Sequence, residues 1–315
     1  MKNYFKADIQ GRGFFKTYIL FFIPIVVLSF FSNPADETRT LFSAIASIAD
    51  SYLSMLLGFA FFCYAVKSVF FKDEGFLFEG SLGRFAPKAL KWLLLSIITL
   101  GIYTPWYVRN YINFYLENLS YKNEKGEFQS RAGTLLKYMF LLVYLPVIVL
   151  TVIMAFFLIR SSGNFYPESG FLFGAAAVVI VFLILIPFIY FYFLWLINIR
   201  FAGYKITFNR SLSETAGFLI VQILLSIITV FIYYPAACVK IFKFLAEGTS
   251  LATEAGSEAG SFGFDGPAGK GFGLLWGQAL LSIITVGIYG PWAMSKVSSW
   301  FISNTFIEGD IKIGE

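Results

Sequence analysis

The chain has 315 residues, of which 58% are hydrophobic and 14% are charged, and its mean hydropathy is +0.73. Soluble domains carry about 25% charged residues, so this composition excludes an ordinary soluble globular protein. The net charge of +5 does not indicate a nucleic-acid partner, because the basic residues lie next to apolar segments, where such residues usually fix membrane topology.

Seven apolar segments have about the 20 residues needed to cross a hydrocarbon core of about 30 Å. Four of them are predicted to cross the membrane as two hairpins: Phe14–Phe31 with Tyr52–Phe71, and Tyr138–Ile159 with Phe171–Ile197. The other three are interrupted by Gly and Pro: Ala89–Val108, Gly217–Val239 and Gly273–Ala293.

The three interrupted segments contain copies of one sequence, Ser-Ile-Ile-Thr-x-Gly-Ile-Tyr-x-Pro-Trp or a close variant. We call them repeat one (96–106), repeat two (226–236) and repeat three (282–292). Three ungapped copies of this length indicate duplication. The first hairpin also aligns with the second at an offset of 122 residues, as Gly11 with Gly133 and Pro24 with Pro146. We therefore expect one membrane domain of three units: hairpin plus repeat (1–121), hairpin plus repeat (122–245) and linker plus repeat (246–315).

The distribution of the 24 Lys and Arg residues predicts how the repeats sit in the membrane. If all seven segments crossed, 13 basic residues would face the cytoplasm and 11 the other side. If each repeat enters and leaves on the same side, only Arg39 and Arg160 lie outside, against 22 inside. The positive-inside rule favours the second topology, with both termini in the cytoplasm. A proline such as Pro105 breaks a helix, so the repeats are predicted to be re-entrant or broken helices.

Short alternating segments flank the repeats and are expected to pair into a small cytoplasmic β-element. They are 76–80, 205–209 and 262–266, with 118–128 and 307–313. Residues Ala246–Lys270 are rich in Gly, Ala, Ser and Glu without apolar periodicity, which predicts a mobile linker. The predicted fold class is an all-α polytopic membrane protein with four full transmembrane helices, three re-entrant or broken repeats and short cytoplasmic β-like segments.

The polar residues of the repeats are candidate site residues, because Ser, Thr and Tyr at positions i, i+3 and i+7 share one helix face. These polar stripes are Ser96, Thr99 and Tyr103, then Ser226, Thr229 and Tyr233, then Ser282, Thr285 and Tyr289. One interpretation is that they converge on a polar solute or a lipid headgroup. The favoured one is structural: the hydroxyls bond between helices or back to the i−4 carbonyl.

Asp50 is the candidate intramembrane acid, and two interpretations of it stay open. If its span begins near Leu41, the carboxylate lies inside the membrane and is a functional candidate. If the span begins at Tyr52, Asp50 is an N-cap at the outer surface. The second is favoured because it leaves a span of ordinary length.

The sequence shows no apparatus for catalysis. The chain has no histidine, which removes the commonest general base and a common metal ligand. Gly266–Gly271 lacks the spacing and the Ser or Thr of a phosphate-binding loop, and no acidic pair has metal-ligand spacing. We therefore expect no catalytic, cofactor-binding or metal-binding residues, and no enzyme.

The two complete copies of the repeat carry a longer pattern: Phe-x-Phe-x-Gly, an apolar run ending Thr-[Leu/Val]-Gly-Ile-Tyr-x-Pro-Trp, and Asn about twelve residues later. It covers 76–118 and 262–304. The pattern resembles the YjgN-like family of bacterial inner-membrane proteins, a family of unknown function. The resemblance implies a location in the bacterial cytoplasmic membrane and no site residues. Repeat two departs from the pattern at Phe231 and Ala236.

We expect an integral inner-membrane protein, and three function classes stay open. The first is transport or permeation of a small solute or lipid, for which internal repeats and broken helices are typical. The second is a non-catalytic scaffold or lipid-interacting protein, whose basic inner face binds anionic lipids. A membrane enzyme is least favoured. The expected partners are anionic lipids on the cytoplasmic side without nucleic acid, and the sequence permits a homo-oligomer.

Overall fold

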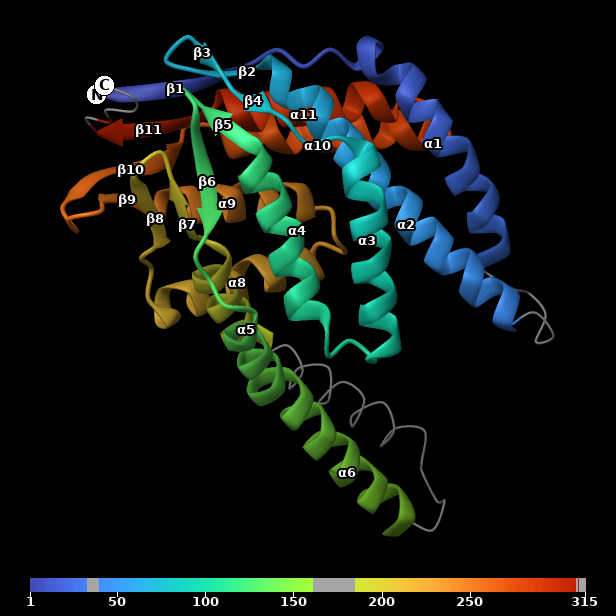
Figure 1. Cartoon of the computed structure of the whole chain (residues 1–315). Helices are drawn as coiled ribbons and strands as arrows, with labels where there is room; N and C mark the ends of the chain where they lie inside the picture. Colours follow the sequence, from blue (N-terminus) through green and yellow to red (C-terminus); the bar gives the residue numbers. More distant parts are fainter. Residues whose placement is uncertain (33–39, 161–184, 310, 312–315) are drawn as a thin grey trace.

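The computed structural model describes residues 1–32, 40–160, 185–309 and 311 (Figure 1). Its first finding corrects the predicted all-α fold class, because the chain contains an eleven-stranded antiparallel sheet. The strands are β1 Lys2–Ala7, β2 Val69–Phe71, β3 Glu74–Gly75, β4 Leu77–Phe78, β5 Leu119–Tyr121, β6 Glu124–Phe128, β7 Asn198–Phe201, β8 Tyr204–Phe208, β9 Thr249–Thr253, β10 Glu258–Phe264 and β11 Thr305–Gly309. The segments expected to be strand-like do pair, but as parts of this much larger sheet.

The sheet closes on itself into a barrel-like ring. Its strand order is β3-β2-β1-β11-β10-β9-β8-β7-β6-β5-β4, and the two strands at the ends of that order are separated in the chain by Phe76 alone. The first half of this segment pairs with β2 and the second half with β5. Closure removes the exposed strand edges that would otherwise invite aggregation.

The helices connect neighbouring strands, mostly as hairpin pairs; α5 and α6 are instead successive parts of one long helix. They are α1 Gly11–Ser32 with α2 Thr40–Ala65, α3 Leu82–Ile98 with α4 Thr104–Asn118, α5 Ala132–Met139 with α6 Leu145–Arg160, α8 Leu212–Ile228 with α9 Tyr234–Glu247, and α10 Ala268–Ile284 with α11 Gly290–Ser303. A π-helical turn, Phe140–Tyr144, joins α5 to α6. A further apolar helix, Leu185–Leu196, precedes β7.

Two kinds of connection join the strands, short turns and helices, and they lie at opposite ends of the barrel. Two-residue turns at positive φ, Lys72–Asp73, Lys122–Asn123 and Ala202–Gly203, join β2 to β3, β5 to β6 and β7 to β8, as expected for hairpins of this kind. A short turn at 254–257, with Gly256 at positive φ, joins β9 to β10. The first and last strands, β1 and β11, pair directly, and the remaining neighbouring pairs are connected through helices. Because the strands are antiparallel, the helical connections leave from one end of the barrel, and the tight turns lie at the opposite end with both chain termini (Figure 1).

Three described helices are long and apolar enough to cross a membrane: Gly11–Ser32, Leu41–Ser68 and Ala132–Ile153. This corrects the expectation of four full transmembrane helices. Most of the fourth predicted segment, Phe171–Ile197, lies outside the described residues, and its described part is the short helix Leu185–Leu196.

Each repeat is a helical pair that turns back on itself. In repeat one, α3 ends at Ile98, the chain turns through Leu100 and Gly101 at positive φ, and α4 begins at Thr104. Pro105 lies in the first turn of α4, where its missing N–H breaks no helical hydrogen bond. Repeats two and three have the same break, between α8 and α9 and between α10 and α11.

The segment expected to be a mobile linker, Ala246–Lys270, contains β9 and β10. Its small residues serve strand pairing: a Cβ at Gly260 would collide with the Glu308 carbonyl oxygen of β11. Glycine is therefore required by the close approach of two strands here.

The interior of the barrel is packed with side chains. A buried cluster, which we call the barrel core cluster, draws residues from strands all around the ring, so it must lie inside it. It comprises Phe71, Tyr121, Tyr204, Leu251, Ile307 and Ile311, with partly buried neighbours that include Phe5, Phe76 and Phe262. The Tyr121 hydroxyl donates to the Phe71 carbonyl at 2.8 Å, which satisfies its polar end inside this apolar core.

Candidate functional site

The serines and threonines of the polar stripes bond to their own helices. In repeat one, the Ser96 hydroxyl donates to the Trp92 carbonyl at 3.0 Å and the Thr99 hydroxyl to the Leu95 carbonyl at 2.8 Å. The same Thr99 oxygen accepts the backbone N–H of Tyr103 at 2.9 Å. The threonine therefore connects the end of one helix to the start of the next across the break.

Repeats two and three reproduce this pattern. Thr229 and Thr285 accept the backbone N–H groups of Tyr233 and Tyr289 at 3.1 and 3.0 Å. The corresponding serines, Ser226 and Ser282, donate to carbonyls four residues earlier and line two different pockets. These are the hydrogen bonds to i−4 carbonyls that the structural interpretation of the polar stripes describes.

The tyrosines of the stripes, in contrast, have different partners. The hydroxyl of Tyr103 accepts from Asn110 Nδ2 at 3.3 Å. The hydroxyl of Tyr233 donates to Gln222 Oε1 at 2.8 Å, and that of Tyr289 accepts from Lys296 Nζ at 2.9 Å. The three copies have therefore diverged at this position.

Asp50 lies well inside α2, which begins at Thr40, so the N-cap interpretation is wrong. Its Oδ1 atom is buried and has no hydrogen-bond partner in the described part of the chain. The helix that holds it, Leu41–Ser68, is one of the three candidate spans.

The differences of repeat two follow from its neighbours. In repeat three, Gly287 lies under α1, and a Cβ there would lie 2.5 Å from Phe22 Cζ. In repeat two, helix α9 packs instead against α10, and Trp276 Nε1 donates to the Ile232 carbonyl at 2.9 Å. Ala236 is buried on α9, where the small side chain suits this direct helix contact. Phe231, at the glycine position, is exposed.

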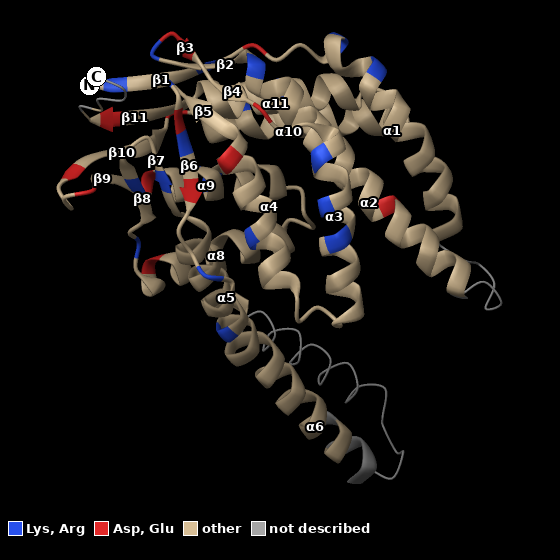
Figure 2. Cartoon of the chain, viewed as in Figure 1, with Lys and Arg blue, Asp and Glu red and all other residues tan. Residues whose placement is uncertain are grey.

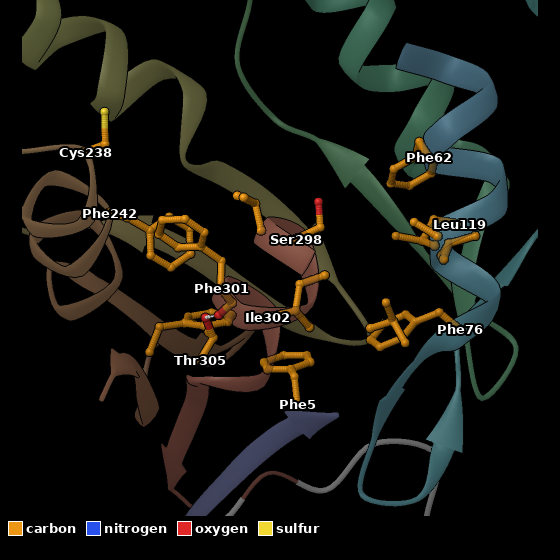
Figure 3. A pocket seen from close by; sticks show the side chains of 15 residues that line it. Phe5, Phe62, Phe76, Leu119, Cys238, Phe242, Ser298, Phe301, Ile302 and Thr305 are labelled. Carbon is orange, nitrogen blue, oxygen red and sulfur yellow. Dashed lines mark hydrogen bonds between the residues drawn. The ribbon is translucent and has the colours of Figure 1, made fainter. Parts of the chain in front are cut away.

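One cavity was not revealed by the polar residues. A cavity of about 640 Å³, which we call the central cavity, lies where the helices meet the barrel (Figure 3). Three helices that return to the sheet, α2, α9 and α11, contribute Phe62, Phe242 and Phe301 to its walls. The complete lining is Phe5, Phe62, Ala65, Val66, Val69, Phe76, Leu119, Cys238, Phe242, Phe262, Val297, Ser298, Phe301, Ile302 and Thr305.

The floor of the central cavity is the barrel core cluster. Phe5, Phe76 and Phe262 belong to the cavity lining and also pack against that cluster. The cavity is therefore closed toward the barrel interior. On its helix side it adjoins a second space of about 390 Å³ between α2, α10 and α11, which we call the side pocket and which shares Val297 and Ser298 with it.

The lining of the central cavity is almost entirely apolar. None of its fifteen lining residues carries a charge, and the polar ones are Ser298, Thr305 and Cys238. The Thr305 hydroxyl already donates to the Phe301 carbonyl at 2.8 Å. Transferring an ionised group into such surroundings without a partner is very unfavourable, so the cavity suits an apolar molecule.

The sequence did carry a signal for this cavity. Phe76 and Phe262 are the first phenylalanines of the two Phe-x-Phe-x-Gly motifs and line the cavity. The second phenylalanine of each motif, Phe78 or Phe264, lies on the same strand face two residues nearer the helices and packs against helix side chains such as Phe59 and Phe301. The motif thus describes the junction between barrel and helices.

Charged residues cluster around the barrel and the helix ends that join it, whereas the far parts of α1 and α6 are almost free of them (Figure 2). At the barrel, Asp265 accepts a hydrogen bond from the Tyr4 hydroxyl and forms an ion pair with Lys2 at 3.1 Å. The hydrogen bond from Tyr4, followed by the contact with Lys2, lowers the pKa of the Asp265 carboxyl. At the start of α8, hydrogen bonds from the backbone and side chain of Ser211 lower the pKa of Glu214.

No curated protein and no solved structure was found to match this chain. A family profile described as a bacterial protein of unknown function, DUF898, matches residues 9–256 and 259–311. These residues cover nearly the whole chain, and the profile represents the family that the repeat motifs resemble, so that prediction is confirmed. The three apolar helices agree with a membrane protein. The chain belongs to this bacterial family of unknown function.

Proposed function

We propose that the protein is a non-catalytic, multi-pass protein of the bacterial inner membrane that binds a lipid by an apolar chain in the central cavity. The observation that carries the proposal is the cavity itself: it is apolar, about 640 Å³ in volume and within the range of about 300–1,000 Å³ that small-molecule sites occupy. Transfer of the lipid is the form of transport that this site favours.

The topology of the barrel supports the membrane placement. Helical connections leave one end of the barrel only, so the helices can enter the bilayer together while the barrel, the tight turns and both termini stay on one side. The distribution of basic residues favours the cytoplasm for that side. The three turns of the repeats expose apolar side chains, including Leu100, Val230 and Val286, as expected for re-entrant hairpins that end in lipid.

Helix length supports re-entry as well. Helix α3 has 17 residues and is about 25 Å long at 1.5 Å per residue, shorter than a hydrocarbon core of about 30 Å. Helix α4 then returns to the barrel. The basic residues of the barrel end would contact anionic headgroups.

Permeation of a small solute through the barrel receives less support. The barrel core cluster fills the interior with aromatic and aliphatic side chains, and the central cavity ends on it. A lipid could reach the cavity from the bilayer by way of the side pocket, between α2 and the hairpin of α10 and α11.

The proposal can be tested by filling the central cavity with a larger side chain. Ser298 lines both the central cavity and the side pocket, so Ser298→Phe should exclude the lipid. The control is Ala44→Phe, because Ala44 is exposed on α2 and lines neither pocket. The Ala44→Phe variant should have an unfolding temperature near that of the wild type. Lipid that co-purifies in mild detergent would be extracted and counted per protein by mass spectrometry.

We expect the wild type and Ala44→Phe to carry tightly bound lipid and Ser298→Phe to lose most of it. Equal amounts of lipid on folded wild type and folded Ser298→Phe would contradict the proposal. So would a wild-type protein that carries no lipid beyond a detergent-exchanged background.

A further inference from the structure

The side pocket contains an unused polar group. Gln278 of α10 lines this pocket, and its Oε1 atom is buried without a hydrogen-bond partner among the described residues. An unpaired buried amide is unfavourable, and most such groups in folded proteins have a partner in protein or water. The position therefore suits a ligand that supplies the missing hydrogen bond.

Repeat two shows what the same residue does when it has a protein partner. Gln222 occupies the position of Gln278, 56 residues earlier, and its Oε1 accepts the Tyr233 hydroxyl at 2.8 Å. In repeat three the corresponding tyrosine, Tyr289, is engaged by Lys296 Nζ at 2.9 Å. Of the two copies with the same glutamine and tyrosine, only repeat three therefore leaves the buried amide oxygen unpaired.

The two copies also differ in the helix that lies beside the turn. Helix α1 packs against α11, and the Tyr18 hydroxyl donates to the Gly287 carbonyl at 2.8 Å. Repeat two has α10 in place of α1 beside its turn. The turns of the two copies therefore lie against different helices.

We propose that the Gln278 amide recognises a hydroxyl group, and that the protein accordingly selects an uncharged, hydroxyl-bearing lipid such as a diacylglycerol. This inference rests on the proposed function and names its substrate class. A hydroxyl both donates and accepts, so it can pair with either end of the amide. Phe61, Leu275, Ala279, Ser282, Ala293, Met294, Val297 and Ser298 complete the pocket lining, and none of them carries a charge that could compensate an ionised headgroup.

The geometry of the two spaces fits such a molecule. The side pocket adjoins the central cavity, since Val297 and Ser298 of α11 line both. One acyl chain would lie in the central cavity and the glycerol hydroxyl in the side pocket beside Gln278. Ser282 offers no competing side-chain donor, because its hydroxyl donates to the Gln278 backbone carbonyl at 2.8 Å.

The test compares two ligands that differ by the hydroxyl alone: dioleoylglycerol and the dioleate of propane-1,2-diol. Both would compete with radiolabelled dioleoylglycerol for the full-length protein, stripped of lipid in detergent. The variants are Gln278→Met, which removes the amide at similar length, and Gln222→Met as the matched control in repeat two. Ser298→Phe reports on the cavity itself.

We expect the wild type to bind dioleoylglycerol about 5- to 10-fold more tightly than the analogue, the effect of one hydrogen bond. Gln278→Met should bind both ligands equally, and Gln222→Met should keep the preference. A wild type that binds the two ligands equally would overturn the inference, as would loss of the preference in both glutamine variants.

The two proposals fail in different ways. If Ser298→Phe binds both lipids as well as the wild type does, the central cavity is not the lipid site and the proposed function is wrong. If Ser298→Phe loses binding but the wild type shows no preference, the cavity binds lipid and only the assignment of Gln278 is wrong.

Discussion

Phe22 of α1 lies directly over Gly287 in the turn of repeat three, so closely that a Cβ at Gly287 would lie 2.5 Å from Phe22 Cζ. Gly101, the equivalent residue in repeat one, has the same backbone conformation, with φ of +87° against +86°, but its nearest such contact is Tyr144 Oη at 3.5 Å. Gly101 is therefore required for its positive φ alone, whereas Gly287 is required both for its positive φ and for the close approach of Phe22.

We expect Gly101→Ala to cost about 1–2 kcal/mol of unfolding free energy, the penalty of a left-handed backbone for an L-residue. Gly287→Ala should cost about 1–3 kcal/mol more, because it adds overpacking against α1. Denaturant unfolding in a fixed detergent would measure both. A double variant with Phe22→Ala should recover part of the loss at Gly287 and none at Gly101. Equal losses at the two glycines would contradict this account.

Replacement of Thr99, Thr229 and Thr285 by Val tests the role of the polar stripes. Each threonine oxygen accepts the N–H of the tyrosine four residues later. Each substitution should therefore lower the unfolding free energy by about 1 kcal/mol. Lipid binding by the folded variants should stay at the wild-type level, because these residues do not line the central cavity. A stable triple variant that no longer binds lipid would instead place the stripes in the binding site.

The contact of Asp265 with Tyr4 and Lys2 predicts a pH effect on barrel closure, since it links the residue after β10 to β1. The pKa of Asp265 is lowered in the folded protein. Its stabilising contribution is therefore complete above the ordinary value of 3.8 and is lost as the pH falls through the lower folded pKa.

Asp265→Asn should accordingly lower the unfolding temperature at neutral pH, and the difference from the wild type should shrink as the pH falls below 3.8. Thermal unfolding as a function of pH would measure this difference. The ion pair is exposed, so we expect a small effect. A difference that stays constant down to the acid limit would show that the carboxylate charge has no part in it.

Single cysteines in the tight turns test the polarity of the barrel. On a background without Cys63 and Cys238, cysteines at Asn123 and Ala202 should react with an impermeant thiol reagent only after the cells are opened. A cysteine at Leu100, in the turn of repeat one, should stay unlabelled because it lies in lipid. Labelling of Asn123 from outside, with Ala202 protected, would mean that the connection between these turns crosses the membrane an odd number of times.

The candidate site was only partly predictable. The polar stripes are visible in the sequence because the residues recur at fixed spacing, yet they bond within their own helices. The central cavity is built from phenylalanines and aliphatic residues of three helices and several strands, and such residues have the same appearance in a sequence whether they fill a core or line a cavity. Gln278 could not be distinguished from Gln222, since both occupy the same place in the repeat and only the tertiary structure shows that one of them is unpaired.

The sequence by itself determined the repeats, their breaks at Gly and Pro, the apolar segments and the family, because each depends on residues close together in the chain. Only the tertiary structure decided the barrel. Its strands have two to seven residues, and alternation marks several of them without showing how they pair. Half of the paired strands are connected in the chain through helices. The pairing of Tyr4 with Phe306 joins the two ends of the chain, and no local pattern encodes it. Closure of the ring then places α2, α9 and α11 around one apolar cavity.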